Sequence, residues 1–192
     1  MSQNPIIPRQ VDQIDWDQWQ PVDRGTILFV IKDGKILLIH KKRGLGAGKV
    51  NGPGGRLDNG ETPLECAIRE IDEEVRVQPV DTRECGQLMF QFLDGYSIRV
   101  WVFRADDCVG TPTSTEEADP FWVSLEEIPY DSMWADDEIW LPMLIREQGF
   151  VGRFVFDQDS MLDYQMIIEA ESDPNQRTEN DQEWTTDERS PG

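Results

Sequence analysis

Apolar residues between positions 25 and 40 form two runs on either side of an Asp-Gly pair at 33–34. Two further runs, 86–93 and 97–104, lie on either side of a second Asp-Gly pair. Apolar runs joined by Asp-Gly are the strongest short-range signal of a β-hairpin. The pattern therefore predicts two hairpins, separated by a segment of different periodicity.

That intervening segment passes from a glycine-rich loop, 44–60, to a stretch whose apolar residues recur every three or four positions, 62–75. Such spacing predicts an amphipathic helix, and Pro63 suits its first turn. A second helix is predicted over 136–148, and further strands are predicted over 121–123, 150–156 and 161–168. Because strands and helices interleave without regular β-α-β alternation, we expect an α+β fold in which helices flank a mixed sheet, an α/β/α sandwich.

The composition divides the chain into three parts. Residues 1–23 are polar except for Trp16 and Trp19 and a few aliphatic residues, and we expect an N-terminal extension that docks through its aromatic side chains. Residues 24–168 contain most of the apolar residues and are predicted to form a single domain. Residues 169–192 contain eight acidic residues and two arginines, which is typical of a disordered acidic tail.

The charge of the chain excludes several classes of partner. Its 192 residues include 38 acidic and 18 basic side chains, for a net charge of −20. Binding to nucleic acid or to an anionic membrane needs clustered lysine and arginine, so we expect neither. No window approaches about eighteen apolar residues and the N-terminal MSQNPIIPRQ is no signal peptide, so we expect a soluble, cytoplasmic protein. The three cysteines lie far apart, and we expect reduced thiols and neither a disulfide nor a zinc site.

Candidate chemistry lies on the predicted helix 62–75. Glu70, Glu73 and Glu74 are three and four positions apart, which puts three carboxylates on one helical face. In so acidic a chain, this spacing alone is typical of a solvated surface.

A longer pattern surrounds these glutamates. Gly55 is followed after five residues by Glu61 and after seven more by Arg69. Together with the Glu, aliphatic and Glu-Glu positions that come next, this spacing resembles the signature of the Nudix superfamily of pyrophosphohydrolases. The final glycine of that signature is Arg76 here. A helix often ends in the left-handed region, which costs a non-glycine residue about 1 kcal/mol, so Arg76 affects the local turn more than the carboxylates.

The resemblance implies a Nudix fold whose catalytic motif is a glycine-rich loop followed by a helix. It also implies Mg²⁺, with Mn²⁺ as an alternative, because carboxylates are the hard oxygen ligands that these ions prefer. The implied catalytic and metal-binding residues are Glu70, Glu73 and Glu74, and which of them is the general base stays open, with Glu73 or Glu74 favoured over Glu70. Gly54 and Gly55 would let the backbone approach metal and phosphates closely. Arg69 is expected to pair with Glu61 as structural support that orients the glutamates.

Segments outside the signature resemble one branch of the superfamily, the animal hydrolases of oxidised purine nucleoside triphosphates (8-oxo-dGTP diphosphatases). These segments are KKRGLGAGKVNGPGG, GQLMFQF, VFRADDCVGTP, DSMWADDEIWLPML and RFVFDQDSMLDY. The likeness implies hydrolysis of 8-oxo-dGTP and 2-hydroxy-dATP to the monophosphate and pyrophosphate. We expect a monomer, although the sequence does not reveal the oligomeric state. The likeness also implies, as substrate-binding residues, Lys41, Asn51, Phe90, Phe92, Trp134, Asp136, Asp137 and Trp140. It adds Glu117 as an outlying metal ligand, whereas Leu45 departs from a phenylalanine of that branch.

The Asp136-Asp137 pair can also be interpreted without the family. Two adjacent carboxylates in an apolar pocket cannot both ionise cheaply, so one should be neutral near pH 7. A protonated and an ionised carboxyl together offer one donor beside several acceptors, which suits an altered purine. The alternative is that Trp134 and Trp140 are core aromatics and that the aspartates cap a helix.

Other functions also stay open at this point. The chain could be a Nudix hydrolase of another nucleoside diphosphate derivative. It could instead bind nucleotide without turnover, or act as an interaction module. His40, the only histidine, is interpreted as a surface residue, and the basic run that follows it at 41–43 could steer a triphosphate.

Overall fold

The central hairpin forms where the apolar pattern predicts it. The computed structural model describes residues 8–168, so the predicted tail lies outside the described residues. Within them, β1 (Asp23–Lys32) and β2 (Lys35–Lys41) pair as antiparallel strands. Asp33 and Gly34 turn the chain with φ angles of 52° and 71°, the positive angles that a tight hairpin turn requires.

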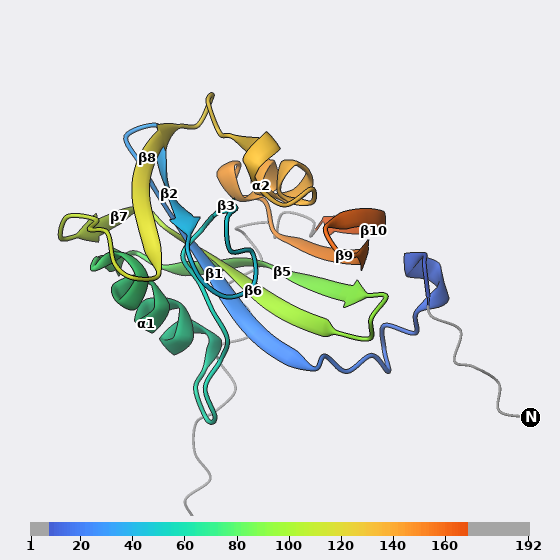
Figure 1. Cartoon of the computed structure of the whole chain (residues 1–192). Helices are drawn as coiled ribbons and strands as arrows, with labels where there is room; N and C mark the ends of the chain where they lie inside the picture. Colours follow the sequence, from blue (N-terminus) through green and yellow to red (C-terminus); the bar gives the residue numbers. More distant parts are fainter. Residues whose placement is uncertain (1–7, 169–192) are drawn as a thin grey trace, which may run out of the picture.

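Eight strands form one mixed sheet, with β1 at its centre (Figure 1). The strand order is β10 (Ser160–Ile168), β9 (Phe150–Asp157), β5 (Arg83–Phe92), β6 (Ser97–Ala105), β1, β2 and β3 (Val50–Asn51), with β8 (Ala118–Ser124) also paired to β2. The β1–β6 and β5–β9 pairs are parallel and the others are antiparallel. The predicted mixed sheet is confirmed.

One helix covers each face of this sheet (Figure 1). β1 supplies alternate residues to the two cores, for example Leu28 to one and Phe29 to the other, which is why nearly all of it is buried. The buried contacts of the helices come from Ala67, Ile71 and Val75 of α1 (Pro63–Val75), and from Trp140, Leu141 and Leu144 of α2 (Asp137–Ile145). The fold is therefore the expected α/β/α sandwich.

Several short elements lie outside the predicted pattern. They are β3, the paired strands β4 (Gln78–Val80) and β7 (Asp107–Val109), and the 3-10 helices η1 (Val11–Gln13) and η2 (Tyr130–Ser132). Elements of two or three residues are too short to show a period. α2 also ends before the predicted limit of 148, because Glu147 adopts a φ of 59°, which stops a right-handed helix.

The thiols agree with the expectation from their spacing. All three cysteines are free, with Cys66 buried and Cys85 and Cys108 half-buried. Neither α1 nor α2, the two α-helices of residues 8–168, is long and apolar enough to cross a bilayer.

Candidate active site

A cavity of about 340 Å³ lies between the glycine-rich loop, α1, the β5–β6 strands and the start of α2. Its charged wall contains Lys41, Arg43, Arg56, Glu70, Glu74 and Glu117, beside Gly54 and Gly55. Its aromatic and aliphatic wall contains Leu88, Phe90, Phe92, Ile98, Val100, Trp134, Trp140 and Phe156, with the polar residues Asn51, Asp136 and Asp137. All the residues that the sequence predicts for substrate binding therefore line one cavity.

α1 begins at a capping box that sets its position. The hydroxyl of Thr62 accepts the N–H of Glu65, and the Glu65 carboxylate accepts the N–H of Thr62 at 2.9 Å. Pro63 is the first helical residue. Because the apolar face of the helix packs on the sheet, Glu70 and Glu74 are turned toward the glycine-rich loop.

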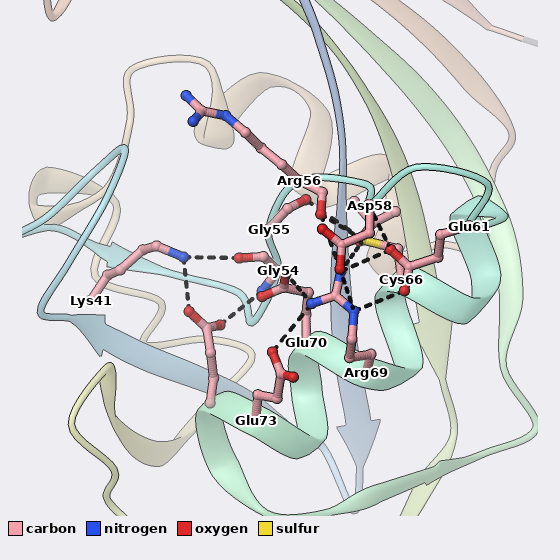
Figure 2. Close-up of polar contacts among 12 residues, drawn as sticks. Lys41, Gly54, Gly55, Arg56, Asp58, Glu61, Cys66, Arg69, Glu70 and Glu73 are labelled. Atoms are coloured by element: carbon pink, nitrogen blue, oxygen red, sulfur yellow. Dashed lines mark hydrogen bonds and ion pairs between the residues drawn. The ribbon is translucent and has the colours of Figure 1, made fainter.

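Glu74 joins the helix to that loop. One carboxylate oxygen accepts the N–H of Gly54 at 2.9 Å, and the other accepts Lys41 Nζ at 2.8 Å. Lys41 Nζ also donates to the carbonyl of Gly54 at 2.8 Å (Figure 2). Lysine, glycine and glutamate thus form a closed triangle in the cavity wall.

Arg69 organises the neighbouring carboxylates (Figure 2). Its guanidinium donates two hydrogen bonds to Glu61, both at 2.8 Å, and one each to Glu70 at 2.7 Å and Glu73 at 3.2 Å. The fork geometry of arginine matches a carboxylate. Hydrogen bonding to Arg69 lowers the pKa of Glu61 to about 2, so this carboxylate stays ionised as an anchor.

The loop needs glycine where it meets β1 and α1. Its backbone runs along β1, with the N–H of Thr26 donating to the carbonyl of Gly55 at 2.8 Å. A Cβ atom at Gly54 would collide with the Thr26 carbonyl, and one at Gly55 would occupy the place of the Glu70 carboxylate. The carboxylate can therefore lie against the loop only because the side chain is missing.

Burial makes the inner two glutamates costly to ionise. Glu74 is 1% exposed, and desolvation raises the pKa values of Glu70 and Glu74 despite their contacts with Arg69 and Lys41. Their side-chain partners, Arg69 for Glu70 and Lys41 for Glu74, are both cations. Hence an all-oxygen set at this cavity, with glycines leaving room beside it, fits a hard divalent cation.

The carboxylates are not gathered around a common point. Within residues 8–168, no three aspartate, glutamate, histidine or cysteine side chains form a ready metal cluster. The Glu73 side chain is 52% exposed and does not line the cavity, because it lies on the outer side of the helical face.

Asp136 and Asp137 are almost fully buried, at 3% and 2% exposed. Asp136 accepts the indole N–H of Trp140 at 2.8 Å, and Asp137 accepts the backbone N–H of Trp134 at 2.9 Å. Burial raises the pKa of both, and the charge of Asp136 raises that of Asp137 further. Asp136 occupies the N-cap position of α2 without any side-chain capping hydrogen bond, which counts against the alternative of a structural cap.

Trp134 stands at the rim of this polar pocket. Lys49 Nζ lies 4.7 Å from its ring centroid, and the ring meets Phe156 edge-on at 6.0 Å. Asn51 also lines the cavity, and its side-chain oxygen accepts the N–H of Gly52 at 2.9 Å.

Some lining residues were missed by the sequence analysis. Phe156 and Arg56 both line the cavity. Phe156 could have been found, since it alternates with Phe154 on a predicted strand, whereas Arg56 carries no local signal. His40 lies exposed on β2 with its ring stacked on Phe121 at 4.7 Å, outside the cavity wall.

Comparisons with known proteins agree on one family. The model of the NUDIX domain matches residues 21–144. An oxidized purine nucleoside triphosphate hydrolase from Mus musculus is 39% identical over 143 residues, covering 73% of this chain and 92% of the relative. A protein of the same name from Danio rerio is 36% identical over 147 residues, covering 76% of this chain and 94% of the relative.

A solved structure supports the fold. The MutT protein from Bacillus halodurans superposes with a TM-score of 0.69 at 23% identity, over 76% of this chain and 97% of that one. At that identity the likeness shows the architecture alone.

Proposed function

Since the chain belongs to the Nudix family of hydrolases, we propose that it converts oxidised purine nucleoside triphosphates to the monophosphate and pyrophosphate. Its proposed substrates are 8-oxo-dGTP and 2-hydroxy-dATP, and its proposed role is to remove damaged nucleotides from the precursor pool. The relatives from mouse and zebrafish carry a name that states this substrate class. The proposal includes a cytoplasmic monomer that does not bind nucleic acid, in keeping with the net charge of −20.

One observation carries the proposal: a single cavity joins a carboxylate wall to an aromatic pocket with two buried aspartates. A nucleoside triphosphate has this same division, with a flat base at one end and a polyanion at the other. Trp134 and Phe92 offer flat faces for a purine. Lys41, Arg43 and Arg56 offer positive charge for the phosphates.

In the proposed reaction, Glu70, Glu73, Glu74 and Glu117 would hold Mg²⁺, or Mn²⁺ in its place. The bound ion supplies neutralisation of the charge on the phosphate oxygens. One of the helix glutamates accepts the proton of the attacking water, with Glu73 or Glu74 favoured over Glu70. Lys41 lines the same cavity, so its ammonium group would attract a phosphate oxygen.

Base selection is assigned to the other end of the cavity. With one proton shared between them, Asp136 and Asp137 can present a donor and an acceptor to the edge of the purine. Asn51 adds an amide that both donates and accepts. Oxidised guanine and oxidised adenine present different edges, so a pair that can exchange a proton suits both.

The test is a substrate panel with the purified protein. With Mg²⁺, pyrophosphate release would be measured for 8-oxo-dGTP, 2-hydroxy-dATP and dGTP, and AMP release for ADP-ribose, with Glu74→Gln as the inactive control. We expect kcat/KM for both oxidised nucleotides to exceed that for dGTP by about tenfold or more. A preference for ADP-ribose would assign a different Nudix substrate, and nucleotide binding without any turnover would leave a binding module.

A further inference from the structure

Residues 8–22, called the arm here, lie almost entirely before the segment that matches the family, which begins at residue 21. The 3-10 helix η1 of the arm lies beside β9 and β10 (Figure 1), where the N–H of Val11 donates to Asp163 at 2.8 Å. Its two tryptophans, Trp16 and Trp19, pack together with ring centroids 5.3 Å apart. Membership of the family does not explain why the chain has this arm.

Trp19 makes a directed contact with the sheet. Its indole N–H donates to the side-chain oxygen of Gln91 at 3.0 Å, across 72 positions of sequence. The amide nitrogen of Gln91 donates in turn to the carbonyls of Phe92 at 3.0 Å and Tyr96 at 3.2 Å. An amide that accepts on one side and donates twice on the other is held in a single orientation.

Two more contacts reach the same turn between β5 and β6. The N–H of Val22 donates to the buried hydroxyl of Ser97 at 3.0 Å. Asp23, the first residue of β1, accepts the hydroxyl of Tyr96 at 2.9 Å. Because Gln91 and Ser97 are cross-strand partners, the arm and its junction with β1 hold both strands of this hairpin next to its turn.

Phe92 is the cavity residue that depends on this turn. It is the last residue of β5, it lines the cavity, and its ring packs on Tyr96 and Phe156, each at 5.6 Å. Strand ends next to turns open more readily than strand centres. A small displacement of an aromatic wall residue is enough to weaken the binding of a stacked base.

We infer that the arm is a positioning element of the substrate pocket, with Trp19 acting through Gln91 to hold Phe92 against the base of the nucleotide. The inference rests on the proposed function in one respect, that the base lies against Phe92. Trp19 touches no substrate and is a positioning residue. Trp16 provides the matched control, because its indole N–H donates at 2.8 Å to Val11, inside the arm itself.

The experiment compares Trp19→Phe with Trp16→Phe. Each substitution keeps an aromatic ring in the arm and removes one indole hydrogen bond, so each should lower the melting temperature slightly. For Trp19→Phe, we expect KM for the oxidised nucleotide to rise about three- to tenfold, the loss typical of one neutral hydrogen bond, with kcat within about twofold of the parent. For Trp16→Phe, we expect both constants to stay within about twofold of the parent.

Hydrogen exchange of the backbone gives a second measurement that needs no substrate. Amides in residues 91–97 should exchange faster in Trp19→Phe than in the parent, and not in Trp16→Phe. If the parent hydrolyses none of the panel, the proposed function fails, while this exchange still supports or refutes the link between arm and turn.

The inference is overturned if KM and exchange are unchanged in Trp19→Phe, or if both variants change them equally. Should Trp19→Phe fail to fold, Gln91→Met cuts the same link while keeping the arm intact. It should then produce the same rise in KM and faster exchange at the turn. Parental values in Gln91→Met would equally refute the inference.

Discussion

Lys41 and Glu74 form an ion pair within the cavity wall, with Nζ and Oε1 2.8 Å apart and side chains 13% and 2% exposed. Burial raises the pKa of Glu74, and the lysine opposes that shift. The pair therefore places a lysine directly against a carboxylate where a divalent cation and a triphosphate are proposed to bind. The ammonium group of Lys41 also lies in the wall of the cavity that is proposed to hold the phosphates of the substrate.

Replacing Glu74 by Gln should reduce kcat by about a hundredfold or more, because the charge of a proposed metal ligand and base is lost. The amide oxygen can still accept the N–H of Gly54, so the fold should persist. The matched control is Asp72→Asn, which removes a carboxylate of the same helix outside the cavity wall. Equal activity in both variants would remove Glu74 from the mechanism.

Replacing Glu73 by Gln should change kcat without changing the melting temperature. The side chain is half exposed, so the melting temperature should stay within about 2 °C of the parent, as for most surface substitutions. If Glu73 turns inward to hold metal, kcat should still fall by orders of magnitude. Parental kcat would show that its contact with Arg69 is its whole role.

Removing divalent cations should abolish hydrolysis, and adding Mg²⁺ or Mn²⁺ should restore it. The cations should also stabilise the folded chain, since they would neutralise buried carboxylates at Glu70 and Glu74. Melting curves with and without Mg²⁺ check this without any nucleotide. Hydrolysis that persists in excess chelator would refute the metal assignment.

The buried aspartates predict the sign of two pH effects. The pKa values of Asp136 and Asp137 are raised by burial, so the folded state binds more protons than the unfolded state from about pH 4 up to those raised values. Stability should therefore fall as pH rises through this window. If the purine base binds to the protonated carboxyl of this pair, the affinity for the nucleotide should also weaken as pH rises.

Asp136→Asn and Asp137→Asn test this pair, because either amide can still accept the N–H groups of Trp140 or Trp134. Each substitution should make stability less dependent on pH. Each should also change the ratio of kcat/KM between 8-oxo-dGTP and 2-hydroxy-dATP by about ten- to hundredfold. The measurement is kcat/KM for both substrates and dGTP from about pH 6 to about pH 9. An equal loss for all three substrates would show that these aspartates do not select the base.

Local pattern predicted the elements that carry the site. The Asp-Gly turn at 33–34, the capped helix and the alternating strands are each written in neighbouring residues, so they appear in the structure where the periodicity indicates. The sequence also predicted that the glutamates share one helical face, but it could not predict which of them are buried and which are exposed. A helix turns about 100° per residue, and only the packing of α1 on the sheet decides that Glu74 is buried and Glu73 is not.

Contacts between distant residues could not be predicted. Trp19 and Gln91 meet only because β5 lies beside the arm, and Arg56 reaches the cavity only because its loop follows β1. No periodicity encodes such pairs. The aromatic composition of residues 1–23 indicated docking, and the structure supplies the partners.

The last prediction concerns Arg76, which ends α1 in the left-handed region with φ of 61° and ψ of 40°. Its N–H still donates to the carbonyl of Asp72, so the helix closes as it would with the glycine of the Nudix signature. A non-glycine residue in this region destabilises the folded state by about 1 kcal/mol. Glycine removes that strain, but it also increases the conformational entropy of the unfolded chain, which offsets part of the gain. Arg76→Gly should therefore raise the free energy of unfolding by about 0.5 kcal/mol, whereas Arg76→Ala, which keeps the Cβ atom, should not. Urea unfolding of the three proteins measures the difference, and kcat should be unchanged because no carboxylate moves. If Arg76→Gly is no more stable than Arg76→Ala, the left-handed cap is not a source of strain here.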